Sequence, residues 1–122
     1  MAYQIDLKTF TDERGNLTVI EKVVPFEIKR VFYIYGVDSS TRGGHRHHHT
    51  FQAAICIKGS CEILNNDGMT EEVYQLDKPH KCLILNPEDW HQMHSFTPDA
   101  ILMVLASAYF DPADYIYDPY IR

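Results

Sequence analysis

The sequence has no long hydrophobic run and few cysteines. No stretch approaches the roughly 20 consecutive apolar residues that a membrane-spanning helix needs. The first ten residues, MAYQIDLKTF, lack the apolar core of a secretion signal, so we do not expect export. The three cysteines, Cys56, Cys61 and Cys82, form no CxxC motif and lie in apolar segments. We interpret them as buried, reduced thiols, which is typical of a cytoplasmic protein.

Positive charge is also scarce. The chain has 11 Lys and Arg against 17 Asp and Glu, which gives a net charge of -6 and a pI of about 5.5. This balance argues against a nucleic-acid surface, which is normally basic. It leaves room for one small anionic ligand held by a local arginine. A length of 122 residues with 45% hydrophobic residues fits a single compact domain over residues 1–122.

No segment shows a sustained helical period, whereas short strand-like segments recur with turns between them. The expected strands are LTVIEKV (17–23), RVFYIYGV (30–37), FQAAICIKGSCEIL (51–64, two strands), EEVYQL (71–76), KCLILN (81–86) and AILMVLAS (100–107). This spacing indicates an all-β sandwich or barrel. One helical turn is expected after Asp111, because Pro112 suits a first helical position.

The C-terminal segment is rich in aromatic residues, whose large apolar surfaces favour burial over contact with water. They are Tyr109, Phe110, Tyr115, Tyr117 and Tyr120. Packing against the barrel and packing against a second subunit are equally consistent with the sequence.

Histidines are concentrated in TRGGHRHHHTFQ (residues 41–52), which holds four of the seven in the chain. The internal position excludes a purification tag, because tags sit at termini. On a strand, residues i and i+2 face the same side, so His45 and His47 are expected to project together into a barrel interior. Gly43 and Gly44 suit a tight turn or a close backbone approach to a ligand.

This pattern resembles the first motif of the cupin superfamily of jelly-roll barrels, which has a glycine-rich lead-in, HxH, a glutamate and then a glycine. His45 and His47 form the HxH, Gln52 stands near the glutamate position, and Gly59 supplies the glycine. The second cupin motif corresponds to NPEDWHQMH (86–94), with aspartate in its glycine position. The predicted fold is therefore an all-β, single-domain cupin (RmlC-like) jelly-roll barrel with a short C-terminal helical turn.

Metal-binding cupins usually supply three histidines and one carboxylate. Here Gln52 offers a neutral amide, and His91 and His94 flank the expected place of the third histidine without occupying it. We therefore predict no metal and no other cofactor. A bulged strand that brought His91 or His94 into the site would keep the metal-dependent alternative open.

Across nearly the whole chain the sequence is similar to the dTDP-sugar 3,4-ketoisomerases, small cupin-type isomerases of bacterial surface-polysaccharide synthesis. The matching segments are DERGNL (12–17), PFEIKRVFYIYGV (25–37), RGGHRH (42–47), ICIKGSCEI (55–63), LDKPHKCLIL (76–85) and LMVLASAYFDPADYI (102–116). Their order and spacing fit without large gaps. The departures are HRHHHT and PEDWHQMH, which point to a different subgroup and substrate epimer.

The resemblance implies an enzyme that moves a keto group from C4 to C3 of a dTDP-linked 6-deoxyhexose, in deoxyamino-sugar biosynthesis. A proton must leave C3 and another must reach C4 through an enediol, which calls for a positioned base and a stabilised enolate oxygen. The resemblance makes His45 and His47 the catalytic pair, and an unperturbed histidine titrates at about 6.5. We predict His47 as the C3 base and His45 for the oxygen or the C4 proton, with the reverse assignment left open.

Five further residues are predicted to bind the substrate. Arg42 is expected to hold a phosphoryl oxygen or polarise the ketone, because guanidinium offers paired donors. Tyr35 is expected to line the same cavity and bind a sugar hydroxyl, and Arg14 to contact the pyrophosphate. Gly44 and Gln52 complete the site. The structural alternatives are a solvated loop charge for Arg42, a core aromatic for Tyr35 and a plain surface turn at Arg14.

Three other functions remain open: a metal-dependent cupin enzyme, a sugar-nucleotide 3,5-epimerase, and a non-catalytic cupin that binds a sugar nucleotide. The expected partners are a small nucleotide sugar and a second copy of the chain, with no nucleic acid and no membrane. The homodimer is implied by the resemblance, and exchange of the N-terminal strand between subunits is compatible with it. The product configuration at C4 stays open.

Overall fold

The computed structural model describes residues 1–121, which contain twelve strands and one 3₁₀ turn. The elements are β1 (Tyr3–Asp6), β2 (Lys8–Asp12), β3 (Gly15–Val19), β4 (Arg30–Tyr35), β5 (Arg42–His47), β6 (Gln52–Lys58), β7 (Cys61–Asn66), β8 (Glu71–Leu76), β9 (Lys81–Leu85), β10 (Trp90–His94), β11 (Ile101–Ala106), η1 (Pro112–Asp114) and β12 (Tyr115–Ile116). None of the helical segments within residues 1–121 has the length and apolarity needed to cross a membrane.

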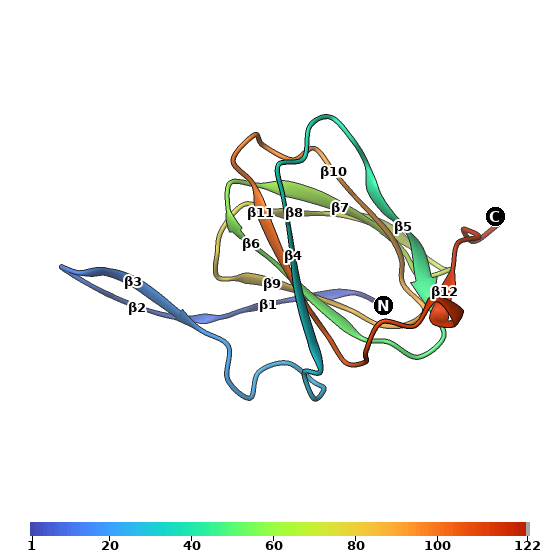
Figure 1. Ribbon diagram of the computed structural model, residues 1–122, viewed down its shortest axis with the longest axis horizontal. Coiled ribbons are helices and arrows are strands. Elements are labelled where there is room, and N and C mark those ends of the chain that lie inside the picture. Colours follow the sequence, from blue (N-terminus) through green and yellow to red (C-terminus); the bar gives the residue numbers. More distant parts are fainter. Residues whose placement is uncertain (122) are drawn as a thin grey trace.

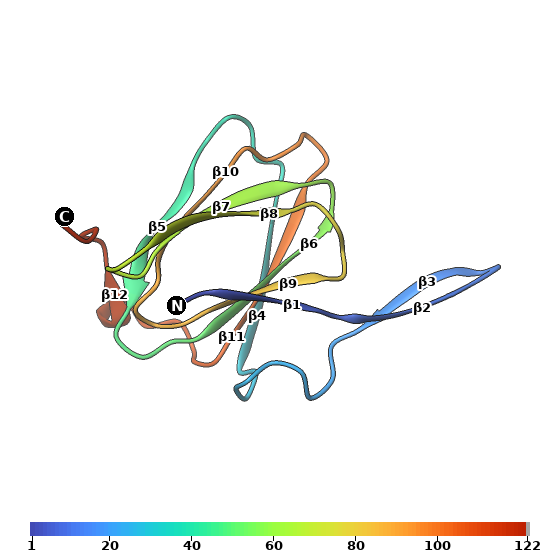
Figure 2. The ribbon, with the colours of Figure 1, turned by 180° about the vertical axis from the view of Figure 1, so that it is seen from behind.

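Two five-stranded antiparallel sheets face each other and form the barrel. Their strand orders are β1-β9-β6-β11-β4 and β12-β5-β10-β7-β8 (Figure 1, Figure 2). The predicted all-β jelly roll is confirmed. The predicted C-terminal turn is confirmed as η1, where the Asp111 side chain accepts a hydrogen bond from the Ala113 amide and Pro112 occupies the first turn.

The core lies between the sheets and is built from alternate residues of the facing strands. In β7, for example, Cys61 and Ile63 are fully buried while Glu62 and Leu64 are partly exposed. All three cysteines are free and buried, as the sequence indicated. A second apolar cluster packs on the outer face of the first sheet, where residues 5–7 and 20–26 cover part of it.

The N-terminal hairpin stands apart from the barrel. Strands β2 and β3 pair only with each other, and both views show them projecting away from the two sheets (Figure 1, Figure 2). Phe10 and Leu17 face each other across this hairpin and are 53% and 60% exposed. The strand predicted over residues 17–23 is shorter than expected, because β3 ends at Val19.

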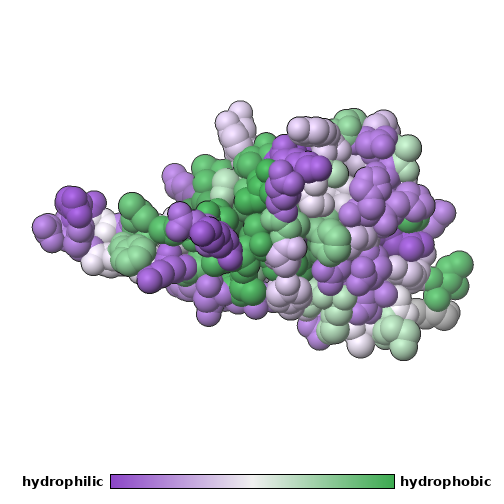
Figure 3. Space-filling view, turned by 90° about the horizontal axis from the view of Figure 1, so that it is seen from below, coloured by the Kyte–Doolittle hydropathy of each residue, from purple (hydrophilic) through white to green (hydrophobic). Residues whose placement is uncertain are grey.

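The uncovered part of the first sheet's outer face is also apolar. Tyr33 and Tyr35 stack on each other and are 64% and 69% exposed. Together with Ile57, Ile101 and Met103 they line an open groove of about 480 Å³. Hydrophobic side chains also gather on the body near the base of the projecting hairpin (Figure 3). Exposed apolar surface of this kind commonly marks an interaction site.

Candidate active site

A cavity of about 160 Å³ opens inside the barrel, with walls from both sheets. Its lining residues are Phe32 and Ile34 of β4, Arg42, Gly43 and His45 of β5, Gln52 of β6, Met93 of β10 and Tyr115 of β12. The cavity therefore joins a hydrophobic wall from the first sheet to a polar wall from the second.

His45 and His47 lie on the same inward face of β5, as their spacing predicts. Their ring centroids are 5.0 Å apart and the planes are nearly perpendicular. Arg46, between them, lies on the opposite face with its guanidinium 4.2 Å from the ring centroid of Tyr120. His45 lines the cavity, whereas His47 is only 4% exposed and lies deeper.

A third imidazole joins this pair from the neighbouring strand. His91 of β10 pairs with His45 of β5, and the register shifts between His91 and Gln92, which marks a β-bulge. The His91 ring centroid is 5.0 Å from that of His45 and 6.4 Å from that of His47. His94 lies outside this cluster, with Nδ1 2.9 Å from the Ser95 hydroxyl.

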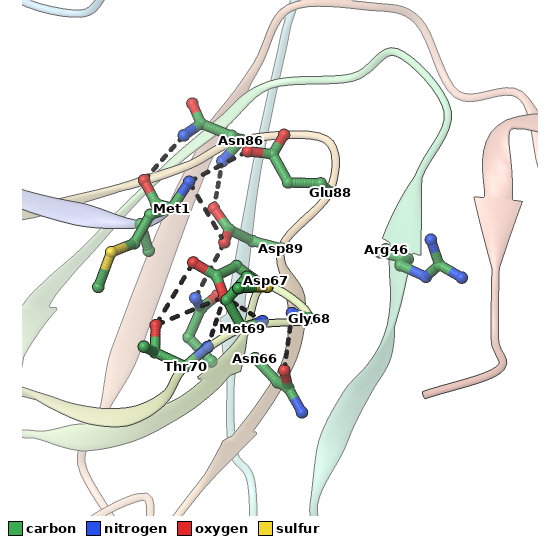
Figure 4. A network of polar contacts seen from close by, with 12 residues as sticks. Met1, Arg46, Asn66, Asp67, Gly68, Met69, Thr70, Asn86, Glu88 and Asp89 are labelled. Atoms are coloured by element: carbon green, nitrogen blue, oxygen red, sulfur yellow. Dashed lines mark hydrogen bonds and ion pairs between the residues drawn. The ribbon is translucent and has the colours of Figure 1, made fainter. Parts of the chain in front are cut away.

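A buried polar network holds the segment before His91. The Asp89 side chain is fully buried and accepts hydrogen bonds from Asn65 Nδ2 (3.0 Å) and the Asn86 amide (2.8 Å), and Figure 4 shows Asp89 and Asn86 joined in this way. The Asp89 carbonyl lies 3.0 Å from His91 Nδ1. A carbonyl only accepts, so Nδ1 carries the proton of a neutral His91 and Nε2 carries the lone pair.

The environment keeps these imidazoles uncharged. Burial, reinforced by the nearby His91, lowers the pKa of His45 to about 4. Burial likewise lowers the pKa of His91 to about 4. For His47, burial lowers the pKa and outweighs the hydrogen bond with Asp114, which acts to raise it; His45 and Arg30 add to the lowering. At pH 7 the cluster therefore holds neutral rings, the form in which an imidazole accepts a proton.

Asp114 on the C-terminal turn is the carboxylate next to this cluster. It is 3% exposed, and its Oδ2 lies 2.9 Å from His47 Nδ1 and also accepts from the Thr50 hydroxyl. Its Oδ1 accepts from the backbone amides of His48 (3.1 Å) and His49 (2.9 Å). Burial acts to raise the pKa of Asp114, but the hydrogen bonds outweigh it and the pKa lies below its ordinary value.

Two of the residues predicted to bind substrate line the cavity, and a third, Gly44, is the chain neighbour of two lining residues. Arg42 and Gln52 line it, and Gln52 is 2% exposed. Within residues 1–121, the buried Gln52 Oε1 has no hydrogen-bond partner, so this cavity-lining side chain keeps an unsatisfied acceptor. Gly44, with φ of +83°, lies beside Gly43, where an added Cβ would come within 3.0 Å of the His91 carbonyl oxygen. Glycine is needed there because β5 passes so close to β10.

Tyr35 and Arg14 do not line this cavity. In β4, Phe32 and Ile34 face the cavity, so the alternation of a strand turns Tyr35 to the outer face, and the expectation that it lines the same cavity is wrong within one chain. Arg14 sits beyond the end of β2, where its guanidinium pairs with Asp12 at 2.5 Å and its side chain is 84% exposed. The β2–β3 hairpin projects from the barrel on the side opposite β5 (Figure 1).

Comparison with known families identifies the chain. The family model described as FdtA: WxcM-like, C-terminal matches residues 2–121. The chain belongs to this family. A relative, the TDP-4-oxo-6-deoxy-alpha-D-glucose-3,4-oxoisomerase of Aneurinibacillus thermoaerophilus, is 43% identical over 115 residues, covering 92% of this chain and 83% of the relative.

Solved structures of ketoisomerases match the fold closely. A sugar 3,4-ketoisomerase from Thermoanaerobacterium thermosaccharolyticum in complex with TDP is 41% identical, with a TM-score of 0.92 over 96% of this chain and 88% of that one. A 3,4-ketoisomerase from Helicobacter canadensis is 37% identical, with a TM-score of 0.92 over 96% and 90% of the two chains. A 4-keto-6-deoxy sugar epimerase from the novobiocin gene cluster of Streptomyces spheroides shares the fold at 19% identity, with a TM-score of 0.81 over 93% and 67% of the chains.

The donor set of this WxcM-like protein does not fit a cupin metal centre. Gln52 supplies an amide where a carboxylate would be needed, and Asp114 is committed to His47, Thr50 and two backbone amides. Although the bulge does bring His91 beside His45, no three His, Cys, Asp or Glu side chains within residues 1–121 are grouped to hold a metal ion.

Three site residues were missed or left open by the sequence. His91 depends on the bulge in β10, Asp114 follows His47 by 67 positions, and Tyr115 pairs with His47 through β12. The Tyr115 ring centroid lies 4.6 Å from that of His45 and 4.7 Å from that of His47. The aromatic tail thus packs partly on its own barrel, while Tyr109 and Tyr117 remain largely exposed. For Tyr115, the concentration of aromatic residues in the C-terminal segment was the sequence signal that could have indicated a site residue.

Proposed function

We propose that this chain is a nucleotide-sugar 3,4-ketoisomerase that converts a dTDP-4-keto-6-deoxyhexose to its 3-keto isomer, within deoxyamino-sugar biosynthesis. The supporting observation is a barrel cavity in which a neutral imidazole, His45, stands beside Arg42 and Gln52 in a member of the WxcM-like family. We also propose a cytoplasmic location, supported by the three free, buried cysteines.

His45 is the group best placed to contact the sugar. It lines the cavity, whereas the Nε2 atoms of His47 and His91 are buried without a hydrogen-bond partner in residues 1–121. The geometry therefore favours the reverse of the division expected from the sequence, in which His45 removes the C3 proton. His47 and His91 pack against the His45 ring and support it without contacting the sugar. A base held within hydrogen-bond reach of its proton contributes about 10²- to 10⁴-fold to a rate.

The reaction then balances within the substrate. His45 takes the C3 proton, the C3–H electron pair forms the C3=C4 double bond, and the negative charge moves to O4. Protonation of O4 gives the enediol, and loss of the O3 proton then gives the isomeric enediolate, whose negative charge lies on O3. Returning a proton to C4 from the imidazolium restores neutral His45 and leaves the ketone at C3. We assign Arg42 to the pyrophosphate or the ketone oxygen and Gln52 to a sugar hydroxyl.

The test of this function is the product. The purified chain is incubated with dTDP-4-keto-6-deoxyglucose, and ¹³C NMR follows the keto carbon. We expect the ketone to appear at C3, and the C4 coupling constants then give the galacto or gluco configuration. A ketone that stays at C4 while C3 or C5 inverts would indicate a 3,5-epimerase, and binding without turnover would indicate a non-catalytic cupin; either result contradicts the proposal.

We propose further that the chain works as a homodimer in which the β2–β3 hairpin crosses to the partner. A two-stranded hairpin is marginally stable alone in water, yet Phe10 and Leu17 are exposed on it and no other strand of residues 1–121 pairs with it. The groove beside Tyr33 and Tyr35 offers the matching apolar surface on a second copy. In such a dimer Arg14 reaches the partner's cavity and contacts the pyrophosphate.

Subunit mixing tests this arrangement. Arg14→Ala and His45→Asn are each expected to be weakly active alone. Co-expressed as a mixture, they should regain activity at about one site in four, because half of the dimers are mixed and each mixed dimer has one intact composite site. Light scattering checks the dimer first. Activity no greater than the sum of the two separate variants would contradict the exchange.

A further inference from the structure

The C-terminal turn η1 places the buried carboxylate of Asp114 next to His47 of the histidine cluster. Asp114 receives hydrogen bonds from the Thr50 hydroxyl and from the amides of His48 and His49, and its Oδ1 also lies 2.8 Å from His49 Nδ1. These bonds are not required to form the turn, because the side chain of Asp111 already caps η1. The bonds fix both oxygens of Asp114 in place.

We propose that Asp114 is a positioning residue that sets the tautomer and orientation of His47, and through His47 supports His45. The catalytic part of this inference rests on the proposed function. An ionised carboxylate only accepts hydrogen bonds, so His47 Nδ1 must donate to Asp114 Oδ2 across their 2.9 Å contact. In neutral His47 the lone pair then lies on Nε2, an atom that is buried and has no partner within residues 1–121.

The fixed ring matters because His45 packs directly on it. His45 lies 5.0 Å from both His47 and His91, measured between ring centroids, so the two rings flank it. Each flanking ring is held by its own Nδ1 acceptor, Asp114 for His47 and the Asp89 carbonyl for His91. When His45 takes up a proton, the buried negative charge of Asp114 lies just behind His47 and stabilises the new positive charge. The other ionisable groups around His47 are Tyr115 of β12, Arg30 of β4 and His49.

Asp114→Asn is the sharpest variant, because it keeps the size of the side chain. The amide oxygen can still accept from the His48 and His49 amides, which turns the NH₂ group toward His47 Nδ1. An NH₂ group donates, so His47 must change to the Nε2–H tautomer. We expect kcat to fall about 10- to 100-fold, by analogy with the loss of a hydrogen-bond partner that orients a metal-bound histidine, with KM changed less than threefold.

The deciding readout is the long-range ¹H–¹⁵N spectrum of the histidine rings, with His47→Asn used to assign the His47 signals. Wild-type protein should show His47 protonated on Nδ1, and Asp114→Asn should show it protonated on Nε2. Thr50→Val, which removes one donor to Asp114, should keep the wild-type tautomer with a smaller loss of kcat. Asp111→Asn on the same turn, which retains the cap, should change neither quantity.

Two results would overturn the proposal: wild-type His47 protonated on Nε2, or an Asp114→Asn variant with unchanged kcat. If Asp114→Asn does not fold, the wild-type spectrum and Thr50→Val still decide. The spectrum needs no substrate. A chain that made no 3-keto product would therefore contradict the proposed function, but the effect of Asp114 on the His47 tautomer could still be measured.

Discussion

Replacing His45 by asparagine is expected to lower kcat for ketone migration by roughly 10²- to 10⁴-fold, the contribution of a positioned general base. Asparagine keeps a polar side chain of similar reach but cannot take up a proton near neutral pH. Binding of dTDP should be nearly unchanged, because the nucleotide is assigned to Arg42 and to the hairpin rather than to this ring. Steady-state kinetics and calorimetric titration with dTDP measure the two effects.

The matched control is His94→Asn. His94 lies on β10 outside the cluster, and its ring has one hydrogen-bond partner among the contacts described for residues 1–121, the hydroxyl of Ser95. This variant should keep wild-type kcat. The kcat of His47→Asn and of His91→Asn should fall less than that of His45→Asn, because these two rings support His45 and do not contact the sugar. A His45→Asn enzyme within threefold of wild-type kcat would remove His45 from the reaction.

Acid is expected to destabilise the fold strongly through the same rings. The pKa of His91 is about 4 in the folded chain and about 6.5 when unfolded, so the unfolded chain binds the extra proton between these values. The stability that neutral His91 contributes is fully present above pH 6.5 and is lost as the pH falls toward 4. At about 1.4 kcal/mol per pKa unit, this difference amounts to roughly 3–4 kcal/mol. His45 acts in the same direction, whereas Asp89, whose pKa burial raises, opposes it.

A loss of this size is a large part of the roughly 5–15 kcal/mol that stabilises an ordinary domain. Urea unfolding at pH 7, 6, 5 and 4.5 measures it. His91→Gln should be less stable at pH 7 but should show a flatter decline toward pH 4.5, while His94→Asn should follow the wild-type curve. Equal declines for wild type and His91→Gln would show that His91 is not held neutral in the folded chain.

The sequence predicted those features that depend on neighbours along the chain. The spacing of His45 and His47 sets their shared face, and Pro112 after Asp111 sets the terminal turn. Gln52 was placed correctly at the cavity, because it follows the HxH motif at a fixed distance.

Other features depend on pairing between distant strands, which one sequence does not encode locally. Tyr35 was misplaced because RVFYIYGV is hydrophobic at both alternating sets of positions, so its pattern does not tell the inner face from the outer. His91 required a bulge that forms only when β10 pairs with β5, and Asp114 required the chain to return to β5 through β12. The hairpin was missed because β2 and β3 pair with no other strand within residues 1–121, so no packing against the barrel shapes their sequence pattern.

The most direct measurement of the central claim is the fate of the C3 hydrogen in D₂O. Proton NMR of dTDP-4-keto-6-deoxyglucose is followed at pH 7 with wild-type protein and with His45→Asn. The wild-type enzyme should remove the C3 hydrogen and form the 3-keto product, whereas His45→Asn should leave the C3–H signal intact on the same timescale. Loss of that signal at equal rates with both proteins would contradict the assignment of His45 as the base.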